Sequence, residues 1–162
     1  MNTLYLITGS NIGDRNKHLA RAVDLIKKNI GIVSKNSSIY ETEPWGNKSQ
    51  SRFYNQILIV ESKLSPENVM KAILGIEKEM GRIRTVKNAA RIIDIDILFF
   101  NNEIINTPSV TVPHKEIQNR RFVLMPLNEI APGLVHPGLG KTIRELLLTS
   151  KDKLDVKALS TF

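Results

Sequence analysis

Two aspartates lie two residues apart inside a segment that otherwise has the composition of a buried β-strand. The segment, residues 91–100, reads RIIDIDILFF. A strand directs residues i and i+2 to the same face, about 7 Å apart, so Asp94 and Asp96 are expected to project side by side. Two such carboxylates repel each other, and a hard cation such as Mg²⁺ relieves that repulsion. The alternative is that the pair marks a solvent-exposed face, with the intervening isoleucines pointing into the core.

Four cationic residues precede the aspartate pair in a segment that is typical of a loop: Arg82, Arg84, Lys87 and Arg91. A guanidinium group binds phosphate oxygens through two parallel hydrogen bonds, which a lysine ammonium group cannot do. Phosphoryl transfer depends mainly on positioning and charge neutralisation, and acidic metal ligands beside cationic side chains provide both. Charge runs are usually solvated, so a solvated loop remains the alternative interpretation.

Further candidates are less specific. Glu77 falls on a predicted helix, where a solvated face is the favoured interpretation and a hydrogen bond to a nucleotide is the alternative. His114 lies close to Arg120 and Arg121 in the sequence, and a triphosphate would suit these three side chains, although a lone histidine more often has a structural role. The glycine-containing segment 9–14 lacks Walker A spacing and is expected to form a simple strand-to-helix turn.

A small group of aromatic and amide side chains would suit a flat heterocycle. Stacking between two rings holds such a ring system, and an amide side chain hydrogen-bonds to its polar edge. The candidates are Trp45, Phe53, Asn55 and Phe122. For both phenylalanines, packing in the core is the favoured interpretation from the sequence alone.

Strands and helices are expected in an order that is typical of one small fold. The strands are predicted at 3–8, 32–43, 53–62 and 94–100, and the long helices at 16–29 and 66–80. The order βαββαβ predicts a ferredoxin-like α+β sandwich, in which the two long helices cover one face of an antiparallel sheet. A hairpin partner is expected at 103–105, a short helix after 113, C-terminal helices at 122–130 and 142–148, and a polar tail from about 151.

The 162-residue chain has the composition of an ordinary globular protein, and its length predicts a single domain over residues 1–162. Cysteine is absent, which excludes disulfides, thiolate metal ligands and a cysteine nucleophile. The sequence shows no signal-peptide pattern and no apolar run of ~20 residues, so we expect a cytoplasmic protein that does not bind membranes. The net charge of +7 favours an anionic ligand but does not identify it.

Taken together and in order, these segments resemble the 6-hydroxymethyl-7,8-dihydropterin pyrophosphokinases of the folate pathway. The most specific are the Arg-x-x-Asp-x-Asp strand at 91–96 and the Pro-His…Asn-Arg-x-Phe segment at 113–122. The likeness covers about residues 3–148 and includes LITGSN (6–11), SIYETEP (38–44), FYN (53–55), GRIR (81–84) and PLNEIAP (126–132). The resemblance implies an enzyme that transfers the terminal diphosphate of ATP to the hydroxymethyl oxygen of the reduced pterin, giving AMP and the pterin diphosphate.

The resemblance also implies a role for each matching residue. Asp94 and Asp96 match the ligands of two Mg²⁺ ions that clamp the triphosphate. The ATP-binding positions are Glu77, Arg82, Arg84, Arg91, His114 and Arg120, of which Arg82 and Arg91 are implied to be catalytic. The pterin-binding positions are Thr42 and Asn55, as hydrogen-bonding groups, and Phe53 and Phe122, as stacking rings. The implied partners are small molecules, and we expect a monomer that binds no nucleic acid.

The chain departs from the family pattern in its arginine-rich loop, which resembles a mobile lid over ATP. Asn88-Ala89-Ala90 stands where Trp-Gly-Pro is common, and the loop is one residue shorter. Ser109 lies near a position that is often basic, and Glu43 replaces a frequent proline. We hypothesise that Trp45, the only tryptophan, takes over the sealing role.

Two other functional classes remain open from the sequence. An RNA-binding module fits the net charge, but it needs aromatic residues on exposed strand faces, and aromatic residues make up only 6% of this chain. A regulatory protein that binds ATP without turnover is the other class, because a lid can be lost without loss of binding. Release of AMP from ATP, with and without the pterin, separates all three classes.

Overall fold

The computed structural model describes residues 1–43, 51–83 and 90–159. The main sheet has the strand order β5-β1-β4-β3-β8, with β2 also paired to β4, and these pairings are antiparallel. The strands are β1 (Asn2–Ser10), β2 (Ile32–Asn36), β3 (Tyr40–Thr42), β4 (Phe53–Ser62), β5 (Asp94–Phe100) and β8 (Val156–Ala158). The chain is therefore an α+β protein with a mainly antiparallel sheet.

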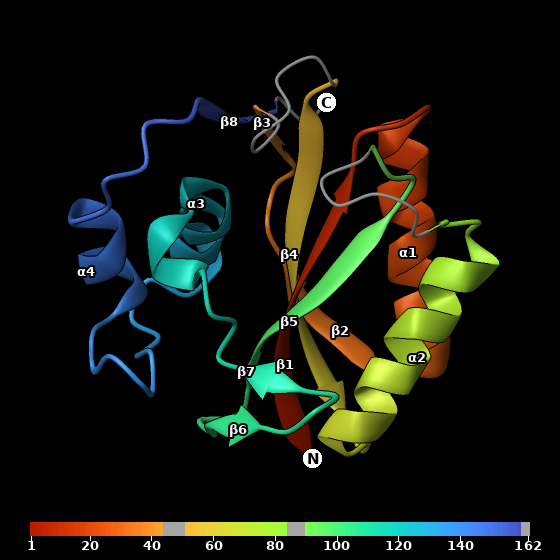
Figure 1. Cartoon of the computed structure of the whole chain (residues 1–162), viewed down its shortest axis with the longest axis horizontal. Coiled ribbons are helices and arrows are strands. Elements are labelled where there is room, and N and C mark those ends of the chain that lie inside the picture. Colours follow the sequence, from red (N-terminus) through yellow and green to blue (C-terminus); the bar gives the residue numbers. More distant parts are fainter. Residues whose placement is uncertain (44–50, 84–89, 160–162) are drawn as a thin grey trace.

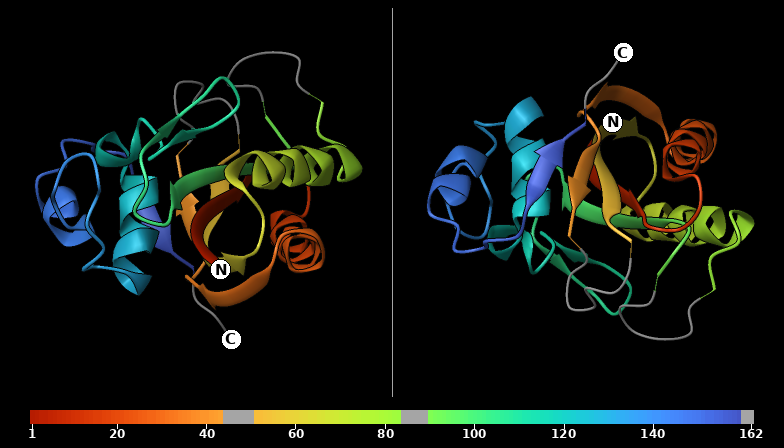
Figure 2. Two further views of the ribbon diagram at one scale, coloured as in Figure 1. Left: turned by 90° about the horizontal axis from the view of Figure 1, so that it is seen from below. Right: turned by 90° about the horizontal axis from the view of Figure 1, so that it is seen from above.

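Helices pack on both faces of this sheet (Figures 1 and 2). The long helices α1 (Arg15–Asn29) and α2 (Pro66–Glu79) lie on one face and form one hydrophobic cluster with β1, β4 and β5. On the other face, α3 (Arg121–Ile130) and α4 (Ile143–Leu148) form a second cluster with the 3₁₀ helix η1 (Ile117–Asn119) and the sheet. The prediction that the two long helices cover one face is therefore confirmed, and the C-terminal helices, for which no face was predicted, cover the other. Within the described ranges, no helix is long and apolar enough to span a membrane.

The two long helices, expected from residues 16 and 66, begin at Arg15 and Pro66, and each follows a capping residue. The Asp14 carboxylate accepts a hydrogen bond from the Lys17 N–H (3.2 Å), and the Ser65 hydroxyl accepts one from the Asn68 N–H (3.2 Å). Helix α2 ends before Gly81, whose φ of 88° suits a residue without a Cβ. This turn places Arg82 beside the last turn of α2, where its N–H donates to the Glu77 carbonyl (3.0 Å).

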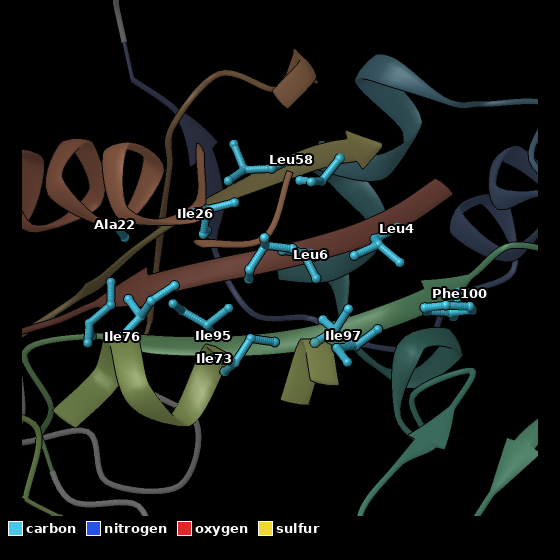
Figure 3. Close-up of a cluster of buried hydrophobic side chains, with 14 of the residues drawn as sticks. Leu4, Leu6, Ala22, Ile26, Leu58, Ile73, Ile76, Ile95, Ile97 and Phe100 are labelled. Carbon is cyan, nitrogen blue, oxygen red and sulfur yellow. The ribbon is translucent and has the colours of Figure 1, made fainter. Parts of the chain in front are cut away.

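Strand β5 has two different faces, as the sequence predicted. The isoleucines at 93, 95 and 97 are buried in the cluster with α1 and α2, and Ile95 and Ile97 lie near Ile73 and Ile76 of α2 (Figure 3). Asp94 and Asp96 consequently point to the opposite face of the sheet. Both are only partly exposed, so the pair does not lie on an open solvent face.

The structure corrects four expectations about the strands. The segment 32–43 forms two strands rather than one. Gly9 and Ser10 belong to β1 and not to a turn. The segment 103–105 does not pair with β5, because β6 (Ile105–Asn106) pairs with β7 (Thr111–Val112) in a separate small sheet. The C-terminal tail contains a strand, β8, which pairs with β3.

Candidate active site

A cavity of about 290 Å³ opens at the edge of the sheet where β1 and β3 end and where β4 and β5 begin. Five of its lining residues are charged residues predicted to bind ATP or metal: Arg82, Arg91, Asp94, Asp96 and Arg120. Four others are the predicted pterin-binding residues Thr42, Phe53, Asn55 and Phe122. The fold therefore brings nine predicted residues, from distant segments of the chain, to one cavity.

Gly9 separates the charged end of the cavity from a second end, which we call the uncharged end because its predicted pterin-binding residues carry no charge. Glu43, which follows Thr42, also lines the cavity. In the sheet, Gly9 pairs with Asp94 of β5 on one side and with Asn55 of β4 on the other. Two strand spacings, about 10 Å, therefore lie between these two residues. A Cβ at position 9 would approach the Asn55 Nδ2 atom to 2.5 Å, so any larger residue would displace the Asn55 amide.

The Asp94 carboxylate is held by an arginine on each oxygen. Arg82 Nη1 donates to Asp94 Oδ1 (2.8 Å), and Arg91 Nη1 donates to Asp94 Oδ2 (2.9 Å). Burial is the largest single influence on the pKa of Arg82, and it lowers this pKa. Asp94 and Glu77 together outweigh burial, so the pKa of Arg82 is raised. Both guanidinium groups are thus held by Asp94 at the wall of the cavity.

Glu77 is almost completely buried, with 2% of its surface exposed, so the expectation of a solvated residue was wrong. Its carboxylate accepts hydrogen bonds from Arg82 Nη1 (2.7 Å) and from the Ile95 N–H (2.9 Å). Glu77 follows Ile73 by four residues and therefore lies on the inner side of α2, a periodicity that could have revealed its burial. The structure places it behind the site, where it supports Arg82.

Asp96 is the carboxyl group of the site whose charged form is most strongly disfavoured. Burial raises the pKa of its carboxyl group from 3.8 to about 7, the nearby Asp94 and Glu77 add to the effect, and Arg120 and Arg82 oppose it. A carboxylate that is disfavoured in this way gains most from an added cation. The arrangement fits Mg²⁺, which binds through oxygen ligands and typically takes one or two carboxylates and completes its shell with phosphates and water.

A larger protein-only metal site is not formed by the described part of the chain, where no group of three or more His, Cys, Asp or Glu side chains converges. The residues present therefore fit a cation that is held jointly with a phosphate ligand.

Asn11 is a residue of the site that the sequence did not single out. Its side-chain oxygen accepts a hydrogen bond from the Arg91 N–H (2.8 Å), and its own N–H donates to the Arg91 carbonyl (3.1 Å). This reciprocal pair fixes the backbone from which the Arg91 side chain reaches Asp94. No local pattern predicted it, because the two residues are 80 positions apart in the sequence.

The uncharged end of the cavity carries polar groups suited to a heterocycle. Asn55 Nδ2 donates to the Thr8 carbonyl (3.1 Å), which orients the amide. The Thr42 hydroxyl is buried and has no hydrogen-bond partner within the described ranges. Since buried hydroxyl groups normally have a partner, this oxygen is suited to a ligand.

The two aromatic rings at this end are half-buried and line the cavity. The favoured expectation that both pack in the core was wrong for Phe53, whereas Phe122 also packs against the second hydrophobic cluster. The Arg91 guanidinium carbon lies 5.8 Å from the centre of the Phe53 ring, and the Arg120 carbon lies 5.6 Å from that of Phe122. Each ring is thus adjacent to an arginine, and the charged and uncharged ends are directly connected.

The remaining predicted residues are less central or are not described. His114 does not line the cavity; its Nδ1 atom accepts a hydrogen bond from the Glu116 N–H (3.2 Å), and burial, followed by the charge of Arg120, lowers its pKa. Arg84, Trp45 and most of the lid segment, including Asn88 and Ala89, lie outside the described residues.

Comparison with known proteins identifies the family. The family model for 7,8-dihydro-6-hydroxymethylpterin-pyrophosphokinase (HPPK) matches residues 5–132. The chain belongs to this family. HPPK relatives include the pyrophosphokinase of Bacillus subtilis, which is 43% identical over 80% of this chain and 78% of its own length, and that of Aquifex aeolicus, 38% identical over 90% of both.

Other HPPK relatives are much longer. The chain is 40% identical to the folic acid synthesis protein fol1 of Schizosaccharomyces pombe but spans only 20% of it. A crystal structure of wild-type Plasmodium falciparum HPPK-DHPS has the same fold, with a TM-score of 0.71 and 20% identity over 91% of this chain and 43% of that one. The chain thus corresponds to one part of these longer proteins.

Proposed function

We propose that the chain transfers diphosphate from ATP to the hydroxymethyl group of 6-hydroxymethyl-7,8-dihydropterin, giving AMP and the pterin diphosphate for folate biosynthesis. Membership of the HPPK family supports this activity. The observation that carries the proposal is a single cavity in which Asp94, Asp96 and two arginines form one end, while Thr42 and Asn55 belong to the other. ATP and a pterin would bind side by side there.

Asp94 and Asp96 are the proposed ligands of two Mg²⁺ ions. When bound, Mg²⁺ neutralises charge on the phosphate oxygens and makes the phosphorus a better electrophile. Two arginines donate to the Asp94 carboxylate, whereas burial raises the pKa of Asp96. Asp96 is therefore the carboxylate with most to gain from the cation.

Arg82 and Arg91 are the proposed catalytic cations, since both line the cavity beside the aspartates. Charge develops on the phosphate oxygens during transfer, and a guanidinium group that is already in place stabilises it without reorganisation. Glu77 holds Arg82 from behind, and Asn11 holds the backbone of Arg91. Arg120, Arg84 and His114 are proposed to contribute to ATP binding, of which Arg120 lines the cavity.

Phe53 and Phe122 are proposed to stack on the pterin ring, and Thr42 and Asn55 to hydrogen-bond to its polar edge. The buried Thr42 hydroxyl without a partner in the described ranges supports this assignment. Trp45 remains our candidate for closing the pterin side of the site.

For the protein as a whole, we propose a ferredoxin-like fold in one domain that acts as a monomer on small molecules. The fold assignment is supported by the order of the four principal strand segments. Taking β2 and β3 together as the second, they lie as fourth, first, third and second across the sheet, with helical crossovers after the first and third.

The direct test is product analysis with ATP, Mg²⁺ and 6-hydroxymethyl-7,8-dihydropterin. We expect AMP and the pterin diphosphate in equal amounts, and no AMP when the pterin or the metal is omitted. Formation of ADP, or release of AMP without the pterin, would contradict the proposal. Binding of ATP without any turnover would indicate a regulatory protein instead.

A further inference from the structure

The C-terminal strand β8 pairs with β3 at the uncharged end of the cavity. Neither the sequence motifs nor the proposed chemistry assigns a role to β8. Strand β3 is only three residues long, and its last residue, Thr42, pairs with Phe53 of β4 on one side and with Val156 of β8 on the other. Thr42 and Phe53 both line the cavity. The wall that carries the proposed pterin contacts is thus held between two strands.

Three polar residues continue this pairing beyond the last strand residues. The Glu43 N–H donates to the Asp155 carbonyl (3.4 Å), and the Asp155 N–H donates back to Glu43 Oε1 (3.2 Å). Arg52 Nη1 donates to Asp155 Oδ2 (3.2 Å). We call Glu43, Arg52 and Asp155 the Asp155 clasp.

The clasp acts at both sides of the cavity wall. Glu43 follows Thr42 directly, and Arg52 precedes Phe53 directly, so Asp155 connects the residues adjacent to two proposed pterin contacts. Arg52 is also anchored to the first turn of α1, because its carbonyl accepts a hydrogen bond from Arg15 Nη1 (2.7 Å). Within the clasp, both hydrogen bonds to Glu43 use the Asp155 backbone, and only the contact with Arg52 uses the Asp155 side chain. A substitution of the Asp155 side chain would therefore release Arg52 and leave Glu43 paired.

We propose that Asp155 is a positioning residue, whose side chain acts through Arg52 to hold Phe53 in the geometry that binds the pterin. This inference rests on the proposed function. The side chains of Arg52 and Asp155 are both 40% exposed, so their ion pair contributes little to the stability of the fold. Its effect is expected on substrate binding, and specifically on the pterin rather than on ATP.

The test compares steady-state kinetics of wild-type protein, Asp155→Asn and Asp155→Glu. For Asp155→Asn we expect the KM for the pterin to rise about threefold to fivefold, the effect of losing up to ~1 kcal/mol from a half-exposed ion pair. The kcat, the KM for ATP and the melting temperature should stay close to the wild-type values. Asp155→Glu retains the carboxylate and should recover most of the affinity for the pterin.

Lys157→Ala is the matched control, because Lys157 Nζ lies 3.6 Å from the same Asp155 carboxylate but its side chain is 69% exposed and does not reach the cavity wall. Its kinetics should match the wild type. An unchanged KM for the pterin in Asp155→Asn, with an active wild type, would overturn the positioning role alone. An inactive wild type would overturn the proposed function as well. Equal increases in both KM values would also contradict a role confined to the pterin.

Discussion

The two ends of the cavity are built on different physical principles. At the charged end, the side chains of Glu77, Arg82, Arg91 and Asp94 hold one another through ion pairs of 2.7–2.9 Å, and Asp96 carries a raised pKa beside them. At the uncharged end, strand pairing places Thr42, Phe53 and Asn55, and a buried hydroxyl group has no partner within the described ranges. The charged end is suited to stabilise charge that develops on a substrate, and the uncharged end is suited to select a substrate by its shape.

The difference implies that the two ends respond to mutation in different ways. Removing a charged group should mainly lower kcat, since its interactions strengthen when charge develops on the phosphates. Removing a group from the uncharged end should mainly raise the KM for the pterin, since its interactions are similar in the ground and transition states. The predictions below test this separation.

The largest effect is expected for Asp96→Ala and Asp94→Ala. Each change removes a carboxylate that we propose to bind Mg²⁺, and losing several kcal/mol of charge stabilisation lowers turnover by about a thousandfold or more. Because burial, Asp94 and Glu77 disfavour the charged form of Asp96, the Asp96→Ala variant should remain folded. Initial rates of AMP formation and a melting curve measure both properties. Near wild-type rates in either variant would contradict the metal-binding role.

The next effect concerns Arg82→Ala, which should lower kcat by about a hundredfold while the KM for ATP changes much less. The exposed Arg144 on α4 offers a matched control, and Arg144→Ala should leave both values unchanged. A melting curve is needed, because Arg82→Ala removes the guanidinium group that pairs with the buried Glu77 carboxylate. Full turnover together with poor ATP binding would reverse the assignment.

A smaller effect of opposite character is expected for Asn55→Ala at the uncharged end. Loss of the amide hydrogen bonds should raise the KM for the pterin by about tenfold, while kcat stays within a few-fold of wild type. Gly9→Ala should shift the KM in the same direction, because the added Cβ would displace the Asn55 amide. If Asn55→Ala lowered kcat and left the pterin KM unchanged, the separation between the two ends would be wrong.

The smallest effect concerns stability and pH. The folded-state pKa of Asp96, about 7, exceeds the ordinary value of 3.8, so protonation of this carboxyl group stabilises the folded state. That contribution is fully present below pH 4 and is lost as the pH rises through 7. Asp94 and Glu77 raise this pKa, and Arg120 and Arg82 oppose them. Asp96→Asn removes the negative charge and should raise the melting temperature at pH 8, without Mg²⁺, by about 2–4 °C for each 1 kcal/mol gained. The gain in melting temperature should be smaller at pH 5. An equal gain at pH 5 and at pH 8 would exclude the charge of Asp96 as its cause.

Several elements followed from local sequence patterns. The bounds of β4 and β5 were predicted at 53–62 and 94–100 and are confirmed, because both segments are rich in β-branched and aromatic residues and are followed by polar or turn-forming ones. The starts of α1 and α2 follow from the capping residues Asp14 and Ser65. Asp94 and Asp96 point to the same face because successive side chains alternate between the two faces of a strand.

Features that depend on distant contacts were not predictable in this way. Strand β8 is three residues long and lies in a polar tail, so only its pairing with β3 reveals it. The burial of Glu77 was missed because its charge suggested a solvated position, and it is buried only since Arg82 and the Ile95 N–H satisfy its carboxylate. Asn11 accepts a hydrogen bond from Arg91, which is 80 positions away, and Glu43 accepts one from Asp155, which is 112 positions away. The sequence contains no local signal for such distant contacts.

The most direct test of the account is a crystal structure of the protein soaked with Mg²⁺, a non-hydrolysable ATP analogue and the pterin. We predict ion density in contact with the carboxylate oxygens of both Asp94 and Asp96, with the phosphates beside Arg82 and Arg91. A ternary complex in which these carboxylates contact no ion would contradict the central claim.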